Sequence, residues 1–217
     1  KGFFLFSLFA LYAMLTALFL TQSVGSWLGL ILTAFIFLVI RGSWKRRAIV
    51  SAITLILLFV SVHSWGQLRK VQAFNDYFHL KMASRLFFWN LGLTLIKDHP
   101  LSGIGMNRVR LRSDVGYESA HLHNHLLHTA AEMGLPALLA YLAMLFIAGY
   151  MSYKIYREVT DGWVKAAALG LSAGQMAHFF YGLTDSIPFG AKPGIFFWIS
   201  LALINALYNS SLKTDKI

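Results

Sequence analysis

Four of the eight histidines in this chain fall within eight consecutive positions, so residues 121–128 hold its densest group of side chains able to do chemistry. An imidazole gains or loses a proton near neutral pH, which suits it to acid–base catalysis. The sequence leaves three uses of this group open: a metal site, a packing role, or acid–base and substrate-binding chemistry by one or two histidines. The four residues are His121, His123, His125 and His128.

A metal site would depend on how these histidines are spaced along a helix. Steps of three or four residues return to the same helix face, and a His-x-x-x-His spacing is compatible with zinc. The residues that share such a face here are His121, His125, His128 and Glu132. The metallopeptidase sequence His-Glu-x-x-His is absent, as is an acidic metal-binding motif. We therefore expect chemistry that needs neither a metal nor another cofactor.

The residues around the histidines predict a helix with a defined start. Asn124 is a favourable N-cap, Gly134 is typical of the position just past a helix end, and Pro136 can open the next helix. His123 then lies just outside a helix N-terminus, where the helix dipole disfavours imidazolium and attracts anions. This position suits a neutral base beside a phosphate.

Cations form a second group, within residues 64–120. Arginine holds phosphate through a bidentate fork, so a phosphate or polyanion site competes here with an ordinary solvated surface. Arg85 is the strongest candidate, because it is expected at the start of an amphipathic helix with Trp89 one turn further on. The other candidate substrate-binding cations are Arg69, Arg108, Arg110 and Arg112.

The composition is that of a polytopic membrane protein. Hydrophobic residues make up 57% of the 217 residues, charged residues only 13%, and the mean hydropathy is +0.60. This is too apolar for a water-soluble domain of the same length. Cysteine is absent, which excludes disulfides and thiolate metal sites.

Six apolar stretches approach the roughly 20 residues that cross a bilayer, and they predict an all-α transmembrane bundle. Short loops rich in Lys and Arg lie on the cytoplasmic side, which places the longest connection on the opposite side. The predicted organisation is three spans in residues 1–63, an outer catalytic segment in 64–134, and three spans with a cytoplasmic tail in 135–217. The predicted spans are residues 3–20, 27–40, 48–62, 135–153, 163–181 and 194–208.

The outer segment is predicted to contain amphipathic helices. Residues 82–97 show apolar side chains at helical spacing, and this helix should end before Pro100 because a residue preceding proline avoids helical backbone angles. We expect the helix to lie near the membrane surface. Glu132, near a helix C-terminus where the dipole disfavours an anion, is expected to have a cationic partner. The apolar positions of the helix are Leu86, Trp89, Leu93 and Ile96.

Three polar residues, Gln175, His178 and Asp185, occur in or just beyond the fifth predicted span. Polar groups at membrane depth usually face a bundle interior or a wet cavity, so helix–helix hydrogen bonding and a shared cavity are both open. Half of a transporter could use His178 and Asp185 as a proton path without covalent chemistry. Most predicted spans are uniformly apolar, however, and the polar groups gather outside them, which favours an enzyme.

Four motifs in combination resemble the signature of the bacterial O-antigen ligase and polymerase superfamily, over about residues 20–150. Ligases of this kind carry His-Asn, nine residues and then Gly, as in His123-Asn124 and Gly134 here. Such proteins usually have about twice as many spans, so the chain resembles their C-terminal half. The motifs are Arg85-Leu-Phe-Phe-Trp89, Asp98-His-Pro-Leu-Ser-Gly-Ile-Gly105, His121-Leu-His-Asn-His-Leu-Leu127 and Ala131-Glu-Met-Gly-Leu-Pro136.

The resemblance implies a glycosyltransferase of the bacterial inner membrane, with residues 64–134 in the periplasm. It would move O-antigen glycan from undecaprenyl diphosphate to lipid A–core. Membrane lipids are the further expected partners, and binding to nucleic acid is not expected. Such a reaction needs a base for the incoming hydroxyl and cations for the departing diphosphate. We assign these catalytic roles to His123 and Arg85, and substrate binding also to Asn124 and His125. The alternatives are an O-antigen polymerase and a protein O-oligosaccharyltransferase, which differ from the ligase in their acceptor.

One position departs from the pattern of similar ligases. They commonly read Gln-Ser-Arg-Gly-x-Trp at the outer end of a span, where this chain reads Gln22-Ser23-Val24-Gly25-Ser26-Trp27. An arginine that would help to hold the lipid diphosphate is therefore replaced by Val24. Either catalysis is weakened in this chain, or another cation takes that role.

Overall fold

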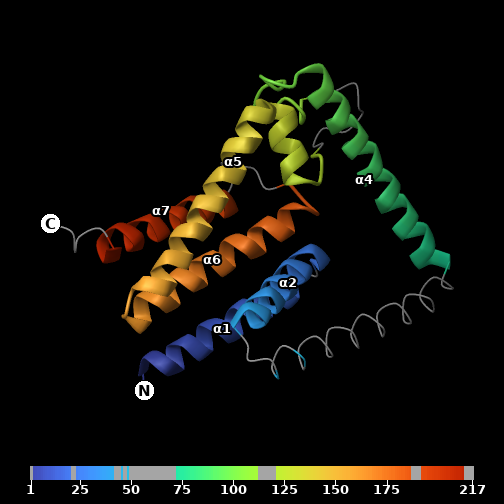
Figure 1. The fold of residues 1–217 in the computed structure, drawn as a ribbon. Coiled ribbons are helices and arrows are strands. Elements are labelled where there is room, and N and C mark those ends of the chain that lie inside the picture. Colours follow the sequence, from blue (N-terminus) through green and yellow to red (C-terminus); the bar gives the residue numbers. More distant parts are fainter. Residues whose placement is uncertain are drawn as a thin grey trace.

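The computed structural model describes residues 2–20, 23–41, 45, 48, 72–111, 121–186 and 192–212. Every regular element within these residues is a helix, so the predicted all-helical fold is confirmed for this part of the chain (Figure 1). The helices are α1 (Gly2–Leu20), α2 (Val24–Arg41), α4 (Gln72–Asp98), α5 (His125–Glu158), α6 (Gly162–Gly182) and α7 (Lys192–Leu212).

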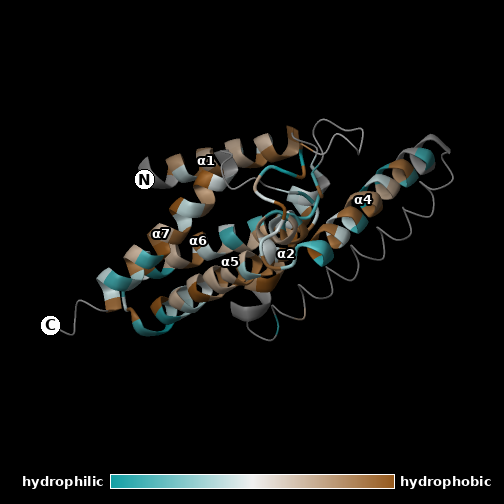
Figure 2. Cartoon of the chain, turned by 90° about the horizontal axis from the view of Figure 1, so that it is seen from above, coloured by the Kyte–Doolittle hydropathy of each residue, from teal (hydrophilic) through white to brown (hydrophobic). Residues whose placement is uncertain are grey.

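Two described helices are long and apolar enough to cross a membrane, namely α5 and residues Gly194–Leu212 of α7. The segments Leu5–Leu20 of α1 and Gly25–Phe37 of α2 are apolar but shorter. Hydrophobic residues are spread over the helical surfaces, as the brown ribbon of Figure 2 shows. Helix α6 corresponds to the fifth predicted span, and the third predicted span lies almost wholly outside the described residues.

Helices α2, α5, α6 and α7 form a bundle in which α2 packs along α6, and α5, α6 and α7 pack against one another (Figure 1). Gly29 permits the close approach of α2 to α6, because a Cβ at this position would lie 2.8 Å from the carbonyl oxygen of Ala177. The N-terminus of α2 is thereby held beside the C-terminus of α6.

Helix α5 is divided by a kink at Gly134, whose φ of 86° and ψ of 168° are not helical. The first limb ends there and the second begins with Leu135 and Pro136, as the sequence predicted. The two limbs fold toward each other, because the ring of His125 in the first lies 5.1 Å from the ring of Tyr141 in the second. In Figure 1 both limbs run to the same side of the kink.

Replacing Gly134 with alanine is expected to lower the free energy of unfolding by about 2 kcal/mol or more. The positive φ strains any side chain, and the new Cβ would overlap the backbone carbonyl of Leu101. Thermal unfolding in detergent would measure the loss. Gly149→Ala is the control, because a Cβ at that helical glycine would meet no described atom within 4 Å other than those of its chain neighbours and its own helix backbone. Equal stability of the two variants would contradict this account of the kink.

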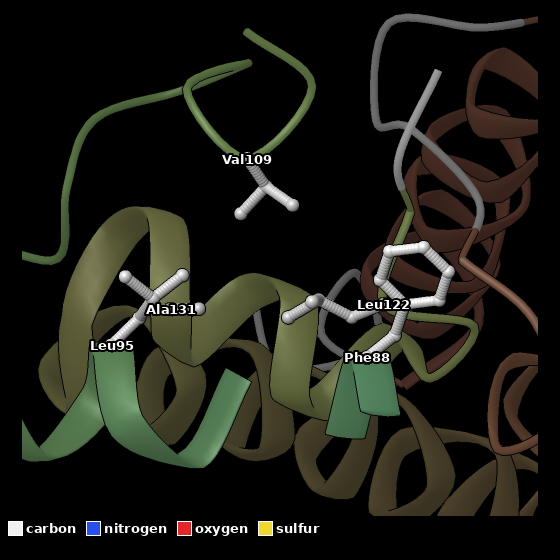
Figure 3. Close-up of a cluster of buried hydrophobic side chains, with 5 residues drawn as sticks. All are labelled: Phe88, Leu95, Val109, Leu122 and Ala131. Carbon is white, nitrogen blue, oxygen red and sulfur yellow. The ribbon is translucent and has the colours of Figure 1, made fainter. Parts of the chain in front are cut away.

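Helix α4 packs against the first limb of α5 through a small apolar core (Figure 3). Phe88 and Leu95 are buried in this core, whereas the predicted apolar positions Leu86 and Leu93 are 51% and 55% exposed. That these two face a membrane surface stays a prediction. Helix α4 also begins ten residues earlier than predicted, at Gln72 rather than residue 82, so Arg85 lies in its middle. The core residues are Phe88, Leu95, Val109, Leu122 and Ala131.

Candidate functional site

His123 lies in the short segment that leads into α5 and has a positive φ of 47°. A residue with a Cβ adopts this left-handed conformation at a cost of roughly 1–2 kcal/mol, so neighbouring contacts must hold it there. The two flanking residues provide those contacts, Leu122 toward α4 and Asn124 toward α5 and α6.

Leu122 anchors His123 to α4. Its side chain is fully buried, and the missing side chain of Gly92 makes room for it, since a Cβ there would lie 2.7 Å from Leu122 Cδ1. The ring of His123 itself lies 6.0 Å from the ring of Phe88, with the two rings edge to face. The base predicted from the sequence is thus held against the helix that carries Arg85.

Asn124 is the N-cap of α5, as predicted. Its side-chain oxygen accepts hydrogen bonds from the backbone amides of Leu126 and Leu127, at 3.0 and 3.1 Å. Its side-chain nitrogen donates to the carbonyl oxygen of Leu183, at 3.4 Å, just beyond α6. These contacts fix the start of α5 against the end of α6, and the substrate-binding role of Asn124 stays a prediction.

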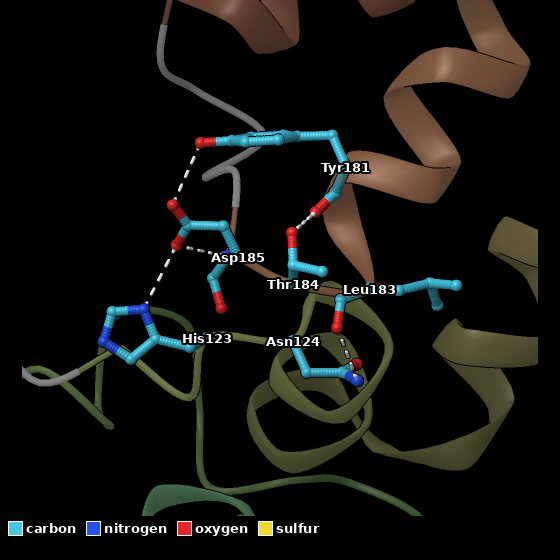
Figure 4. A network of polar contacts seen from close by, with 7 residues as sticks. His123, Asn124, Tyr181, Leu183, Thr184 and Asp185 are labelled. Carbon is cyan, nitrogen blue, oxygen red and sulfur yellow. Dashed lines mark hydrogen bonds and ion pairs between the residues drawn. The ribbon is translucent and has the colours of Figure 1, made fainter. Parts of the chain in front are cut away.

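Asp185 is the partner of His123 (Figure 4). His123 Nδ1 lies 3.3 Å from Asp185 Oδ1, and the two side chains are 38% and 39% exposed. The hydroxyl of Tyr181 donates to the other carboxylate oxygen at 2.9 Å, and the Ser186 amide donates to Oδ1 at 2.8 Å. The sequence singled out Asp185 but gave no reason to pair it with His123.

The hydrogen bonds around Asp185 keep its carboxyl group ionised. Partial burial would raise its pKa, but the hydrogen bonds that it accepts, first of all from His123, outweigh burial and hold the pKa below its usual value. The carboxylate therefore persists above this lowered pKa, and its contact with His123 is lost only as the pH falls through it. At neutral pH, a carboxylate that accepts from Nδ1 leaves Nε2 as the basic nitrogen of the ring.

His123 and Arg85 line the same cavity of about 370 Å³. This volume lies in the range of roughly 300–1,000 Å³ typical of small-ligand sites. Arg85 reaches the cavity from α4, and His123 from the segment before α5. Among the described residues, Leu80, Lys81 and Ser84 also line it.

The way residues are arranged on one face of α4 explains why Arg85 lines the same cavity as His123. Residues three or four positions apart share a helix face. Ser84 and Arg85 therefore lie on the same face of α4 as the buried residues Phe88 and Leu95, nearer the N-terminus of the helix. The C-terminal half of this face is apolar and packs on α5. Its N-terminal half is polar and lines the cavity.

The N-terminus of α2 lies close to the same site. A Cβ at Gly25 would overlap Thr184 Oγ1 and come within 3.3 Å of the Tyr181 ring. Thr184 directly precedes Asp185, the partner of His123. Val24, where similar ligases carry arginine, thus precedes a residue that packs beside this network.

Within the described residues, Glu132 binds two backbone amides and pairs with His128. Its carboxylate oxygens accept from the amides of Asn107 and Val109, at 2.9 and 3.1 Å, and thereby order the turn that follows α4. Gly105 donates to its backbone carbonyl. Nε2 of His128 lies 3.5 Å from the carboxylate and is a charged partner only when that ring is protonated.

The other three histidines of the cluster do not line the cavity. His121 and His128 lie together, with ring centres 5.8 Å apart. His125 is only 3% exposed, and its ring faces Tyr141 and His178 inside the bundle. Within the described ranges, no cluster of three or more His, Asp or Glu residues has the arrangement of a metal site. The substrate-binding role of His125 stays a prediction.

The other predicted cations and polar residues lie elsewhere. Arg108 and Arg110 are exposed in the turn after α4 and do not line the cavity, while Arg69 and Arg112 lie outside the described residues. Gln175 makes hydrogen bonds between helices, one of the two possibilities left open by the sequence. Its Nε2 donates to the carbonyl oxygen of Phe197 at 2.9 Å and to Ser200 Oγ.

Comparison with known proteins identifies the family. A family model described as O-antigen ligase matches residues 9–142, more than half of the chain, and this range includes Arg85 and His123. No curated protein matches the chain. The family consists of membrane enzymes of the glycosyltransferase type. The motifs and the family match agree, and the chain belongs to the O-antigen ligase family.

Proposed function

We propose that the chain belongs to a glycosyltransferase of the inner membrane that transfers O-antigen glycan from undecaprenyl diphosphate to lipid A–core on the periplasmic face. The observation that carries this proposal is the cavity lined by both Arg85 and His123. A base and a phosphate-binding cation in one cavity are the two groups that the transfer requires.

The proposed reaction exchanges one glycosidic bond for another. The acceptor hydroxyl oxygen attacks the anomeric carbon of the glycan, and its proton passes to Nε2 of His123. The bond from the anomeric carbon to the phosphate oxygen breaks, and its electron pair leaves with undecaprenyl diphosphate. Arg85 stabilises the negative charge that develops on this leaving group. Asp185 is a positioning residue that orients His123 and stabilises the imidazolium.

The acceptor distinguishes this function from its alternatives. Full-length protein in lipid would be incubated with lipid-linked glycan and either lipid A–core or a pilin peptide, and the products separated by mass. Glycosylated lipid A–core supports the proposal, whereas a glycosylated peptide or a longer lipid-linked glycan indicates an oligosaccharyltransferase or a polymerase. Movement of the glycan across the membrane without a covalent product would indicate a transporter.

Arg85→Lys is expected to lower the turnover of the donor by roughly tenfold or more, because a point charge cannot reproduce the bidentate contact of a guanidinium with phosphate. Initial rates at saturating acceptor would measure the effect. Arg110→Lys is the matched control, since Arg110 is exposed and outside the cavity. Full activity of Arg85→Lys would rule out its assigned role.

A further inference from the structure

Lys81 lines the cavity with Arg85 and His123 but has no part in the function proposed so far. We propose that Lys81 binds the second phosphate of the donor and gives the site its preference for a diphosphate over a monophosphate. This inference rests on the proposed function, because it concerns the donor of the same reaction. It adds a specificity-determining residue to the two catalytic residues assigned above.

The geometry of α4 places the two cations side by side. Lys81 and Arg85 are separated by four residues, which is about one helical turn and a rise of about 6 Å. Residues at this spacing point from the same face, and both line the cavity. Ser84 lies between them on the same face and adds a hydroxyl that can donate to a phosphate oxygen.

The charges of this pair favour an anion with two phosphates. Like charges four residues apart on a helix repel each other, and a bound anion that contacts both removes that repulsion. The guanidinium of Arg85 can grip one phosphate with two parallel hydrogen bonds, whereas the ammonium of Lys81 is a compact point charge for the other. A monophosphate held in the fork of Arg85 has no second phosphate for Lys81.

Arg85 and Lys81 lie at different distances along α4 from the residue that contacts His123. Arg85 lies one turn before Phe88, whose ring meets that of His123 at 6.0 Å, and Lys81 lies one turn further away. The phosphate bonded to the sugar must lie closer to the base than the lipid-linked one, because the anomeric carbon that it leaves is attacked by the hydroxyl oxygen that gives its proton to His123. Arg85 therefore takes the sugar-linked phosphate and Lys81 takes the lipid-linked one.

Binding of inorganic diphosphate and inorganic phosphate to the full-length protein in lipid nanodiscs tests this inference without turnover. Titration calorimetry would compare the wild type with Lys81→Gln, Lys81→Arg and the control Lys97→Gln, which alters an exposed lysine of α4 outside the cavity. Lys81→Gln is expected to weaken diphosphate binding about tenfold or more and phosphate binding less than about twofold. Lys81→Arg should retain most of the diphosphate affinity, and Lys97→Gln should match the wild type.

Three results would overturn the inference: unchanged diphosphate binding in Lys81→Gln, equal weakening of diphosphate and phosphate, or equal losses in Lys81→Gln and Lys97→Gln. Arg85→Ala in the same titration separates this inference from the proposed function. Loss of binding in Arg85→Ala beside normal binding in Lys81→Gln refutes the role of Lys81 and leaves the proposed function intact. Normal binding in Arg85→Ala contradicts the proposed function itself.

Discussion

Replacing His123 with alanine is expected to lower the rate of glycan transfer about 10²–10⁴-fold, the usual effect of removing a positioned base. Insertion and abundance should be unchanged, because the side chain is 38% exposed and the fold is held by Leu122 and Asn124 on either side. Transfer to lipid A–core, normalised to the amount of protein in the membrane, measures the effect.

Two histidines of the same cluster are the controls for this variant. His121 and His128 contact each other outside the cavity, so His121→Ala and His128→Ala should cost much less than His123→Ala. Equal losses for all three would indicate a metal site or a structural role.

Asp185→Asn adds a second comparison for the same base. It should lower the rate less than His123→Ala, because the base remains but the imidazolium that forms during transfer loses its neighbouring anion.

Val24→Arg in the full-length protein is expected to raise the rate of glycan transfer at least tenfold. Valine cannot donate to phosphate, and a missing charge-assisted contact weakens transition-state stabilisation by roughly 2–4 kcal/mol, judged from the loss of one oxyanion donor. Even with Lys81 on one phosphate, the chain with Val24 lacks this additional contact and should therefore be folded but slow. Position 24 directly precedes Gly25, which packs beside Thr184 and Tyr181 at the edge of the site.

Val24→Gln separates charge from size in this experiment. It introduces a long polar side chain without a cation, and we expect less than half of the gain of Val24→Arg on the free-energy scale, because hydrogen bonds from charged donors are about twice as strong as neutral ones. Expression should change little in either variant. No gain with arginine, or a loss, would mean that the diphosphate is held elsewhere and that the alignment of α2 to the family is wrong.

Local sequence signals predicted the parts of the site that depend on local backbone preferences. Asn124 was expected to cap a helix, and its side-chain oxygen does accept the amides of Leu126 and Leu127. Gly134 was expected to end that helix, and its φ of 86° is the reason that a glycine is needed. Such features can be read from a sequence because each is decided within a few residues.

Tertiary contacts decided the parts that the sequence did not predict. Two apolar stripes of α4 are compatible with helical spacing, and only packing against Leu122 shows that Phe88 rather than Leu86 is buried. Glu132 was expected to have a cationic partner, but the sequence did not predict that its carboxylate also accepts from the backbone amides of Asn107 and Val109. Neither the packing of Leu122 on α4 nor the amide partners of Glu132 can be read from the local sequence.

A structure of the full-length His123→Ala variant with its lipid-linked donor, determined by cryo-electron microscopy, tests the central claim most directly. Removal of the base should leave the donor intact and bound. The account predicts that phosphate oxygens lie about 3 Å from the guanidinium of Arg85, with the anomeric carbon facing the position of the missing imidazole. A diphosphate bound outside this cavity, for example at Arg108 and Arg110, would contradict it.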